Sequence, residues 1–237
     1  MFIDPETLAN DLDRLEGIEK GSIRLVAQAL AEFRRTAAEI FRREKDLEAD
    51  IGEDITREAL DRIGVSKIEV RLFGKMDYKR ARYVFNKDYA VRQALFVDSK
   101  AEQIEGQRTA TLQTAQTSMR IRQVRQHQAV DEPGKLPPII ESEVGKCLTT
   151  TIFVKYNYAE LRSENRLDSI IVAALPNGML QERYNPNPHD TIWRAGRNAP
   201  TRGEPFRVRL VFGLLKEKAR WRVQVIPMHP RPFRWDD

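Results

Sequence analysis

The hydrophobic period of the chain changes near residue 65, and this change constrains the fold more than any other feature. Over residues 17–46 apolar side chains recur every three or four positions, with Arg and Glu on the other faces, which predicts one long amphipathic helix. From Val65 onward the period is two, which is typical of strands. A helical N-terminal part followed by β-rich segments predicts an α/β domain.

The apolar stripe of residues 17–46 includes Phe33, Ile40 and Phe41. Such a stripe packs either on the core of its own chain or on a partner subunit. We expect the core and keep a subunit contact as the alternative. A short second helix is predicted over residues 55–63, capped by Asp54 and ended by Gly64.

The remainder of the chain predicts a mixed sheet. Strands are expected at 65–72, 75–85 and 90–100, a helix at 107–127 and a loop at 131–138. Further β-rich segments are expected at 148–158, 168–175, 179–184, 206–212 and 221–226. This order predicts a single domain over residues 1–237, with a central mixed β-sheet flanked by helices.

Charge is distributed unevenly along the chain. The net charge is +5, but residues 1–61 hold 16 acidic and 9 basic side chains, a net of −7, so the remainder carries +12. A basic body favours a polyanionic partner such as nucleic acid, although a solvated basic surface is the alternative.

Other function classes are disfavoured by composition. No apolar run approaches the roughly 20 residues of a membrane span. The first residues lack the basic and apolar regions of a secretory signal. The single Cys147 excludes an internal disulfide and a cysteine-built zinc site, and the three histidines have no metal-ligand spacing. We therefore expect a reducing, cytoplasmic setting.

The stretch LFVDSKAEQ, residues 95–103, runs from apolar residues into ionisable ones. Asp98, Lys100 and Glu102 are two residues apart, so on a strand all three project from one face. They mark either a strand turning into solvent or a metal site that cuts phosphodiesters. Phosphodiester hydrolysis needs a hard cation, usually Mg2+, held by carboxylates from different strands and a backbone carbonyl. A neighbouring lysine activates the attacking water or stabilises charge on phosphorus.

Two assignments of the acids are possible. In the favoured one, residues 98–100 form the acid-x-lysine triplet and Asp77 is the partner acid, brought back by a hairpin. In the rival one, residues 77–79 form the triplet and Glu69 or Asp61 is the partner. The rival lysine lacks an apolar strand before it, which favours the first assignment.

These residues resemble a known nuclease signature. Asp77 with Asp98-Ser99-Lys100 is similar to the PD-(D/E)xK pattern, although Met76 stands where that pattern has proline. The segments KMDYKRARYVF, FVDSKAE and TLQTAQTSM more narrowly resemble the SfiI type of type II restriction endonucleases. The similarity extends from about residue 55 to the PNPHDTIW and PTRGE stretches.

The resemblance implies a restriction-endonuclease-like fold and Mg2+-dependent cleavage of double-stranded DNA at an interrupted, G·C-rich palindrome. It implies Asp77, Asp98 and the backbone carbonyl of Ser99, which lies between Asp98 and Lys100, as metal ligands, and Lys100 as the residue that activates water. It also implies a homotetramer that bridges two sites, or a dimer as in related enzymes. Residues 62–130 would form the catalytic core and 145–237 a β-rich DNA-recognition part, with 1–61 an acidic helical part.

DNA contacts are predicted mainly from an arginine-rich stretch. Residues 194–209 hold five arginines and one acid, and Arg207 and Arg209 alternate with Val208 on a predicted strand. Arginine bidentate to guanine is the commonest specific base contact, whereas contacts to phosphates alone are the alternative. The weaker DNA-binding candidates are Arg202, Gln103, Gln107 and Arg108. The arginines at 120, 122 and 125 are expected on a helix face that is solvated or contacts phosphates.

Two other functions remain open. One is a repair or recombination nuclease that recognises DNA structure and not sequence. The other is a DNA-binding protein of the same fold that has lost cleavage.

Overall fold

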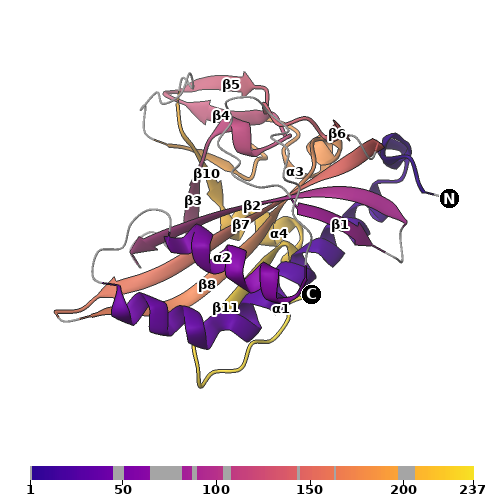
Figure 1. Cartoon of the computed structure of the whole chain (residues 1–237). Coiled ribbons are helices and arrows are strands. Elements are labelled where there is room, and N and C mark those ends of the chain that lie inside the picture. Colours follow the sequence, from indigo (N-terminus) through magenta and orange to yellow (C-terminus); the bar gives the residue numbers. More distant parts are fainter. Residues whose placement is uncertain are drawn as a thin grey trace.

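Strand β7, Gly145–Glu160, lies at the centre of the fold because both of its faces are covered. Its residues 147–157 are buried without a break, which is the pattern of a strand enclosed between two layers. In the computed structural model, β7 pairs in parallel with β2 (Val91–Gln103) and antiparallel with β8 (Asn165–Leu175) (Figure 1). The structure describes residues 2–44, 51–64, 82–86, 90–103, 108–142, 145–162, 164–196 and 206–237, with 82–86 as backbone.

Two sheets and one hairpin make up the β structure of the described residues. The large sheet has the order β1-β2-β7-β8-β11, and β6 also pairs with β7. The small sheet has the order β3-β10-β9, and β4 and β5 form the hairpin. Their bounds are β1 Arg82–Asn86, β3 Thr109–Leu112, β4 Ile121–Arg125, β5 Gln128–Glu132, β6 Ile139–Ser142, β9 Trp193–Ala195, β10 Val208–Val211 and β11 Val223–Pro227.

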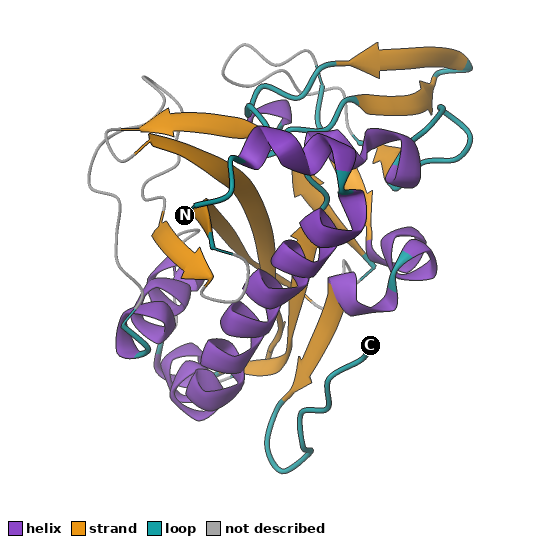
Figure 2. Ribbon diagram, turned by 90° about the vertical axis from the view of Figure 1, so that its right-hand side faces the viewer, coloured by secondary structure: helices purple, strands orange, loops and turns teal. Residues whose placement is uncertain are grey.

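Helices α1 (Leu12–Arg43) and α2 (Ile51–Arg62) cover one face of the large sheet (Figures 1 and 2). Side chains of β7 two residues apart, such as Val154 and Tyr156, point to this layer and join its apolar cluster. Phe33 and Phe41 of the α1 stripe are buried in the same cluster. The stripe therefore packs on the core of its own chain, as expected.

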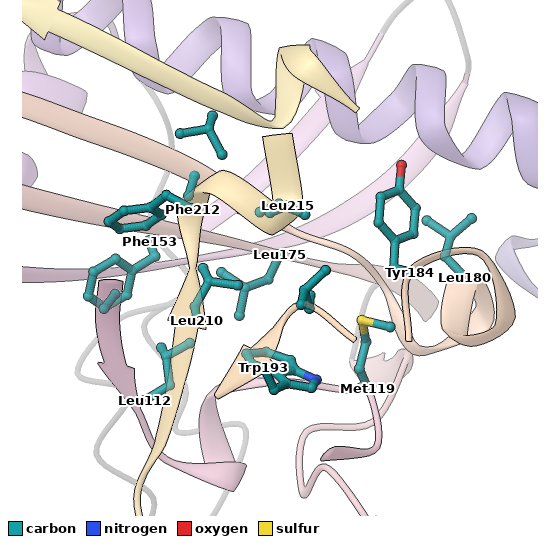
Figure 3. Close-up of a cluster of buried hydrophobic side chains, with 14 of the residues drawn as sticks. Leu112, Met119, Phe153, Leu175, Leu180, Tyr184, Trp193, Leu210, Phe212 and Leu215 are labelled. Carbon is teal, nitrogen blue, oxygen red and sulfur yellow. The ribbon is translucent and has the colours of Figure 1, made fainter. Parts of the chain in front are cut away.

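The other face of the large sheet packs against the small sheet. Phe153 and Leu175 from the large sheet lie in one buried cluster with Leu112, Trp193 and Leu210 of the small sheet (Figure 3). Two short helices, α3 (Gln181–Tyr184) and α4 (Phe212–Lys218), complete this side. Single 3-10 turns lie at Pro5–Asn10, Thr114–Gln116, Gly178–Leu180 and Arg220–Arg222. No helix in the described part of the chain has both the length and the hydropathy that a membrane span requires.

The helix predicted over residues 107–127 is wrong. This stretch forms β3, a 3-10 turn and β4. Threonines of β3 pair with β10, far away in the sequence, and this long-range pairing outweighs the absence of Gly and Pro from the stretch. The β4–β5 turn consists of Gln126 and His127, both at positive φ, where Asn or Gly is usual, so the sequence carried no hairpin signal.

The expected arginine-rich helix face is therefore also absent. Arg120 and Arg122 lie on the hairpin side of the molecule and both form ion pairs with Asp131. Arg122 also pairs with Glu182, and Arg125 stacks on the ring of Phe206 at 4.7 Å. These arginines are held by the protein itself.

Three smaller expectations also change. Residues 179–184 are helical, because Asn177 caps a 3-10 turn by accepting from the Met179 N–H. Helix α2 begins at Ile51, so Asp54 lies in its first turn and is not its cap. Gly64 follows the helix with φ of 75°, as predicted. The strand predicted at 65–72 lies outside the described residues.

A buried ion pair joins α1 to the 3-10 turn that precedes β11. Glu19 and Arg222 are both fully buried, and Arg222 Nη2 donates to Glu19 Oε2 at 2.7 Å. Glu19 also accepts from the Asn177 N–H at 2.8 Å. Burial raises the pKa of Glu19, whereas the charge of Arg222 lowers it. The pair thus fixes the helix layer to the loop that follows β8.

We expect Arg222→Met to lower the free energy of unfolding by about 3–5 kcal/mol, because it leaves the Glu19 carboxylate buried without its partner. The double variant Glu19→Gln/Arg222→Met should recover about half of this loss or more, since Gln keeps an acceptor for Asn177 and carries no charge. Urea unfolding at one fixed protein concentration measures both. A double variant no more stable than Arg222→Met would contradict this account.

Candidate active site

The carboxyl-terminal half of β2 carries the predicted triplet on the face toward the small sheet. Asp98, Lys100 and Glu102 alternate with Ser99 and Ala101, as the strand prediction requires. In the parallel register Lys100 lies beside Lys155 of β7. Two lysines and two carboxylates therefore meet between the layers.

Helix α2 is fixed against the opposite face of β2. The first turn of α2 approaches closely at Gly52, where an added Cβ would lie 3.2 Å from the Tyr156 ring and 3.4 Å from the Ala101 nitrogen. Thr56 Oγ1 lies 2.7 Å from both Ser99 Oγ and the Tyr156 hydroxyl. These buried contacts bring the first turn of α2, with Glu53, to the edge of the site.

Asp98 is the electrostatic centre of the described site. Burial raises its pKa to about 6, and the charge of Lys100 opposes this shift. Glu53 raises the pKa further by repulsion, whereas a hydrogen bond from Gln116 lowers it. Among the described residues, Asp98 Oδ2 is buried and has no hydrogen-bond partner. A buried carboxylate oxygen without a partner is costly and attracts a cation.

The described residues fit part of a Mg2+ site. Hard cations prefer oxygen ligands, and the free Oδ2 of Asp98 beside the backbone of Ser99 offers such oxygens. The predicted second acid, Asp77, lies outside the described residues, as do Glu69 and Lys79 of the rival assignment. Within the described chain, no cluster of three or more His, Cys, Asp or Glu side chains could hold a metal.

The lysine ammonium groups link the site to the small sheet. Lys100 Nζ donates to the Thr111 carbonyl of β3 at 2.5 Å and lies 5.6 Å from the centre of the Phe153 ring. Lys155 Nζ donates to the Thr109 carbonyl at 2.8 Å and pairs with Glu102 at 2.6 Å. Strands β2 and β7 thus each contact β3 through one lysine.

Strand β10 carries the predicted reading arginine directly across from β3. Arg209 lies opposite Thr111 on one side and Arg194 on the other. It is half-buried and Arg207 is exposed, whereas Val208 between them is buried. Arg207 immediately precedes β10, so that its sharing a face with Arg209 stays a prediction of the alternation.

Of the four remaining DNA-binding candidates, two lie within the described residues and two lie outside them. Gln103 ends β2 and Arg108 immediately precedes β3, and both are exposed. Gln107 and Arg202 lie outside the described residues. Gln103 and Arg108 thus flank the same part of the site from two strands.

The comparisons with known proteins agree with this geometry. Residues 19–226 match the family described as "Type II restriction enzyme SfiI". The type II restriction enzyme SfiI of Streptomyces fimbriatus is 36% identical over 231 residues, covering 90% of this chain and 84% of the relative. The chain belongs to the SfiI family of type II restriction enzymes. It is therefore a site-specific deoxyribonuclease.

Solved structures support the family fold. The tetrameric restriction endonuclease SfiI, crystallised with cognate DNA, has a TM-score of 0.82 and 33% identity, covering 94% of this chain and 90% of its own. The restriction endonuclease BglI, crystallised with its DNA recognition sequence, has a TM-score of 0.75 at 16% identity, covering 95% and 94%. The second likeness shows the fold alone. The expected α/β fold with a central mixed sheet is confirmed.

Sequence reasoning missed three residues at this SfiI-family site. Glu53 lies in a helix whose packing on β2 depends on the fold. Gln116 was placed in a predicted helix that does not exist. Lys155 lies in the predicted strand 148–158, but only the register of β2 against β7 reveals its position beside Lys100. The one available signal was a lysine within an otherwise apolar and threonine-rich strand.

The electrostatics of Asp98 can be measured without metal. We expect its carboxyl carbon to titrate by NMR with a midpoint near 6 in the metal-free protein. Glu53→Gln should lower this midpoint, because it removes a repelling charge, and Lys100→Met should raise it, because it removes an attracting one. Asp13→Asn, an exposed carboxylate of α1, serves as the control. A midpoint near 4, unchanged in both variants, would refute the described arrangement.

Proposed function

We propose that this enzyme cleaves double-stranded DNA in a Mg2+-dependent reaction at an interrupted, G·C-rich palindrome. One observation carries the proposal: a buried Asp98 oxygen that has no hydrogen-bond partner among the described residues lies beside Lys100, on the strand end that faces the arginine-bearing small sheet. The family resemblance of these residues supplies the form of the site, and SfiI itself was crystallised with cognate DNA.

The proposed ligands of Mg2+ are the carboxylates of Asp77 and Asp98 and the backbone carbonyl of Ser99. The bound ion would gather negative charge and favour an ionised water. Lys100 would orient the attacking water and stabilise the charge that builds on phosphorus. Its tie to the Thr111 carbonyl restricts where its ammonium can point. Gln116 would hold the Asp98 carboxylate through its hydrogen bond.

Base reading is assigned mainly to Arg207 and Arg209. Two guanidinium groups on one strand face suit guanine O6 and N7 in the major groove. Arg202, Gln103, Gln107 and Arg108 form a second set of proposed DNA contacts. In this division residues 62–130 form the catalytic core, 145–237 the recognition part and 1–61 the acidic helical part, whose long helix stays away from DNA.

We propose that the enzyme is a homotetramer, with a dimer as the alternative. A palindrome presents two identical half-sites, so two identical subunits must meet it about a two-fold axis. The SfiI structure, at 33% identity, is that of a tetramer.

We also propose that the enzyme works in a reducing cytoplasm, which suits its single cysteine, the buried Cys147 without a disulfide.

Substitution of the acids tests the catalytic assignment. We expect Asp98→Ala and Asp77→Asn to abolish plasmid cleavage in Mg2+, because the ion loses a ligand. Specific binding in Ca2+ should persist, because the base contacts remain. Gel analysis of plasmid incubated with wild type should give discrete bands, whereas a smear indicates a nuclease without sequence specificity and no change indicates an inactive binder. Asp13→Asn is the matched control and should cleave normally. Loss of activity in Glu69→Gln but not in Asp77→Asn would favour the rival triplet.

Substitution of the arginine tests the readout. We expect Arg209→Ala to lower the ratio of specific to non-specific affinity by about 1–3 kcal/mol, the effect of one lost bidentate contact. Competition binding in Ca2+ against random duplex measures this ratio. Arg220→Ala, an exposed arginine paired with Asp236, is the control and should leave the ratio unchanged. Equal weakening on random DNA, with a smaller salt slope, would make Arg209 a phosphate contact.

A further inference from the structure

Two lysines on neighbouring strands hold the same edge of β3. Carbonyls two residues apart on a strand point to the same side, so the contacts at Thr111 and Thr109 fall on one edge. Strand β3 pairs with β10 and ends the small sheet in the described structure. The ammonium groups of Lys100 and Lys155 thus donate to carbonyls of β3 that a neighbouring strand would otherwise bind.

Burial of the Lys155 ammonium at this position costs free energy. It is fully buried on the central strand, and a buried ammonium loses hydration that its partners must replace. Its carboxylate partner, Glu102, is one-third exposed and stands two residues from Lys100 on the same face of β2. The cleavage chemistry proposed above does not use Lys155.

We propose that Lys155 is a positioning residue for cleavage, an inference that rests on the role proposed for Lys100. Lys155 holds Glu102 away from Lys100, so that the catalytic ammonium does not form the competing ion pair on its own strand. It also fixes the Thr109 end of β3, and so sets the position of Thr111, the residue that anchors Lys100.

The same arrangement aligns the proposed cleavage residue with the proposed base-reading residue. Thr111 lies directly opposite Arg209 in the small sheet. One residue of β3 therefore sits between the catalytic lysine and the proposed base-reading arginine, and Lys155 holds that strand from the side of the large sheet. Loss of Lys155 should impair the alignment of Lys100 while leaving the DNA-binding face intact.

The test compares cleavage and binding in the full-length enzyme. The probe is a duplex carrying a site mapped from wild-type cleavage of plasmid DNA. We expect Lys155→Met to lower the single-turnover rate at saturating enzyme by about 100-fold, the scale of a small misplacement of a reacting group. The Kd for the same duplex in Ca2+ should change by less than about threefold, because the base contacts are kept.

A second variant separates positioning from damage to the fold. Lys155→Met/Glu102→Gln should regain about tenfold or more in rate, because Gln carries no charge to compete for Lys100. Lys146→Met, which breaks the ion pair with Glu6 near the other end of β7, is the matched control and should cleave at the wild-type rate.

Each outcome has a distinct meaning. A wild-type rate in Lys155→Met overturns the inference and leaves the proposed function intact. The inference is also overturned if Lys155→Met loses rate and binding equally and the added Glu102→Gln does not restore the rate. Lys155 would then serve only as a structural ion pair. Full activity in Lys100→Met instead overturns the proposed role of Lys100 and the inference about Lys155 that rests on it, whereas the proposed cleavage of DNA would stand.

Discussion

The parallel pairing of β2 with β7 is the constraint on which the rest of the molecule depends. It runs in unbroken register from Gln93 beside Leu148 to Gln103 beside Tyr158. Because side chains alternate between faces, this register decides which residues meet the helices and which meet the small sheet. A slip of one residue would turn Asp98 and Lys100 toward the apolar helix layer and destroy both the core and the site.

The two faces of this pairing have opposite chemistry. On the helix side, the hydroxyl of Thr56 forms hydrogen bonds with those of Ser99 and Tyr156, so that these buried contacts involve no charged group. The charged side chains of this pairing, Asp98, Lys100, Glu102 and Lys155, lie on the other side. The raised pKa of Asp98 follows from its enclosure there. The fully buried Lys155 experiences the same enclosure and depends on Glu102.

The elements that carry their own local pattern were predictable. The long N-terminal helix followed from its periodicity, and the strand with the triplet and the two central strands followed from their β-rich, apolar composition. Strand parity correctly placed Asp98, Lys100 and Glu102 on one face. The β3–β4 region was wrong because its hydrogen-bond partners lie far away in the sequence. The role of Lys155 could not be foreseen, since its meaning depends on a register that joins residues 55 positions apart.

The contact between the two sheets through Lys100 and Lys155, here called the joint, is more adjustable than the backbone pairing of a continuous sheet. A backbone ladder would couple the small sheet to β2 through regularly spaced bonds that admit no adjustment. Two ammonium groups on long, flexible stems hold β3 at two points instead, and they can follow small rotations of the strand without breaking the central pairing. A shift of β10 against DNA would then reach Lys100 through Thr111, whereas Asp98 would stay fixed on β2 of the large sheet. With the roles proposed for Lys100 and Arg209, such a joint would couple the alignment of the lysine to the reading of the bases.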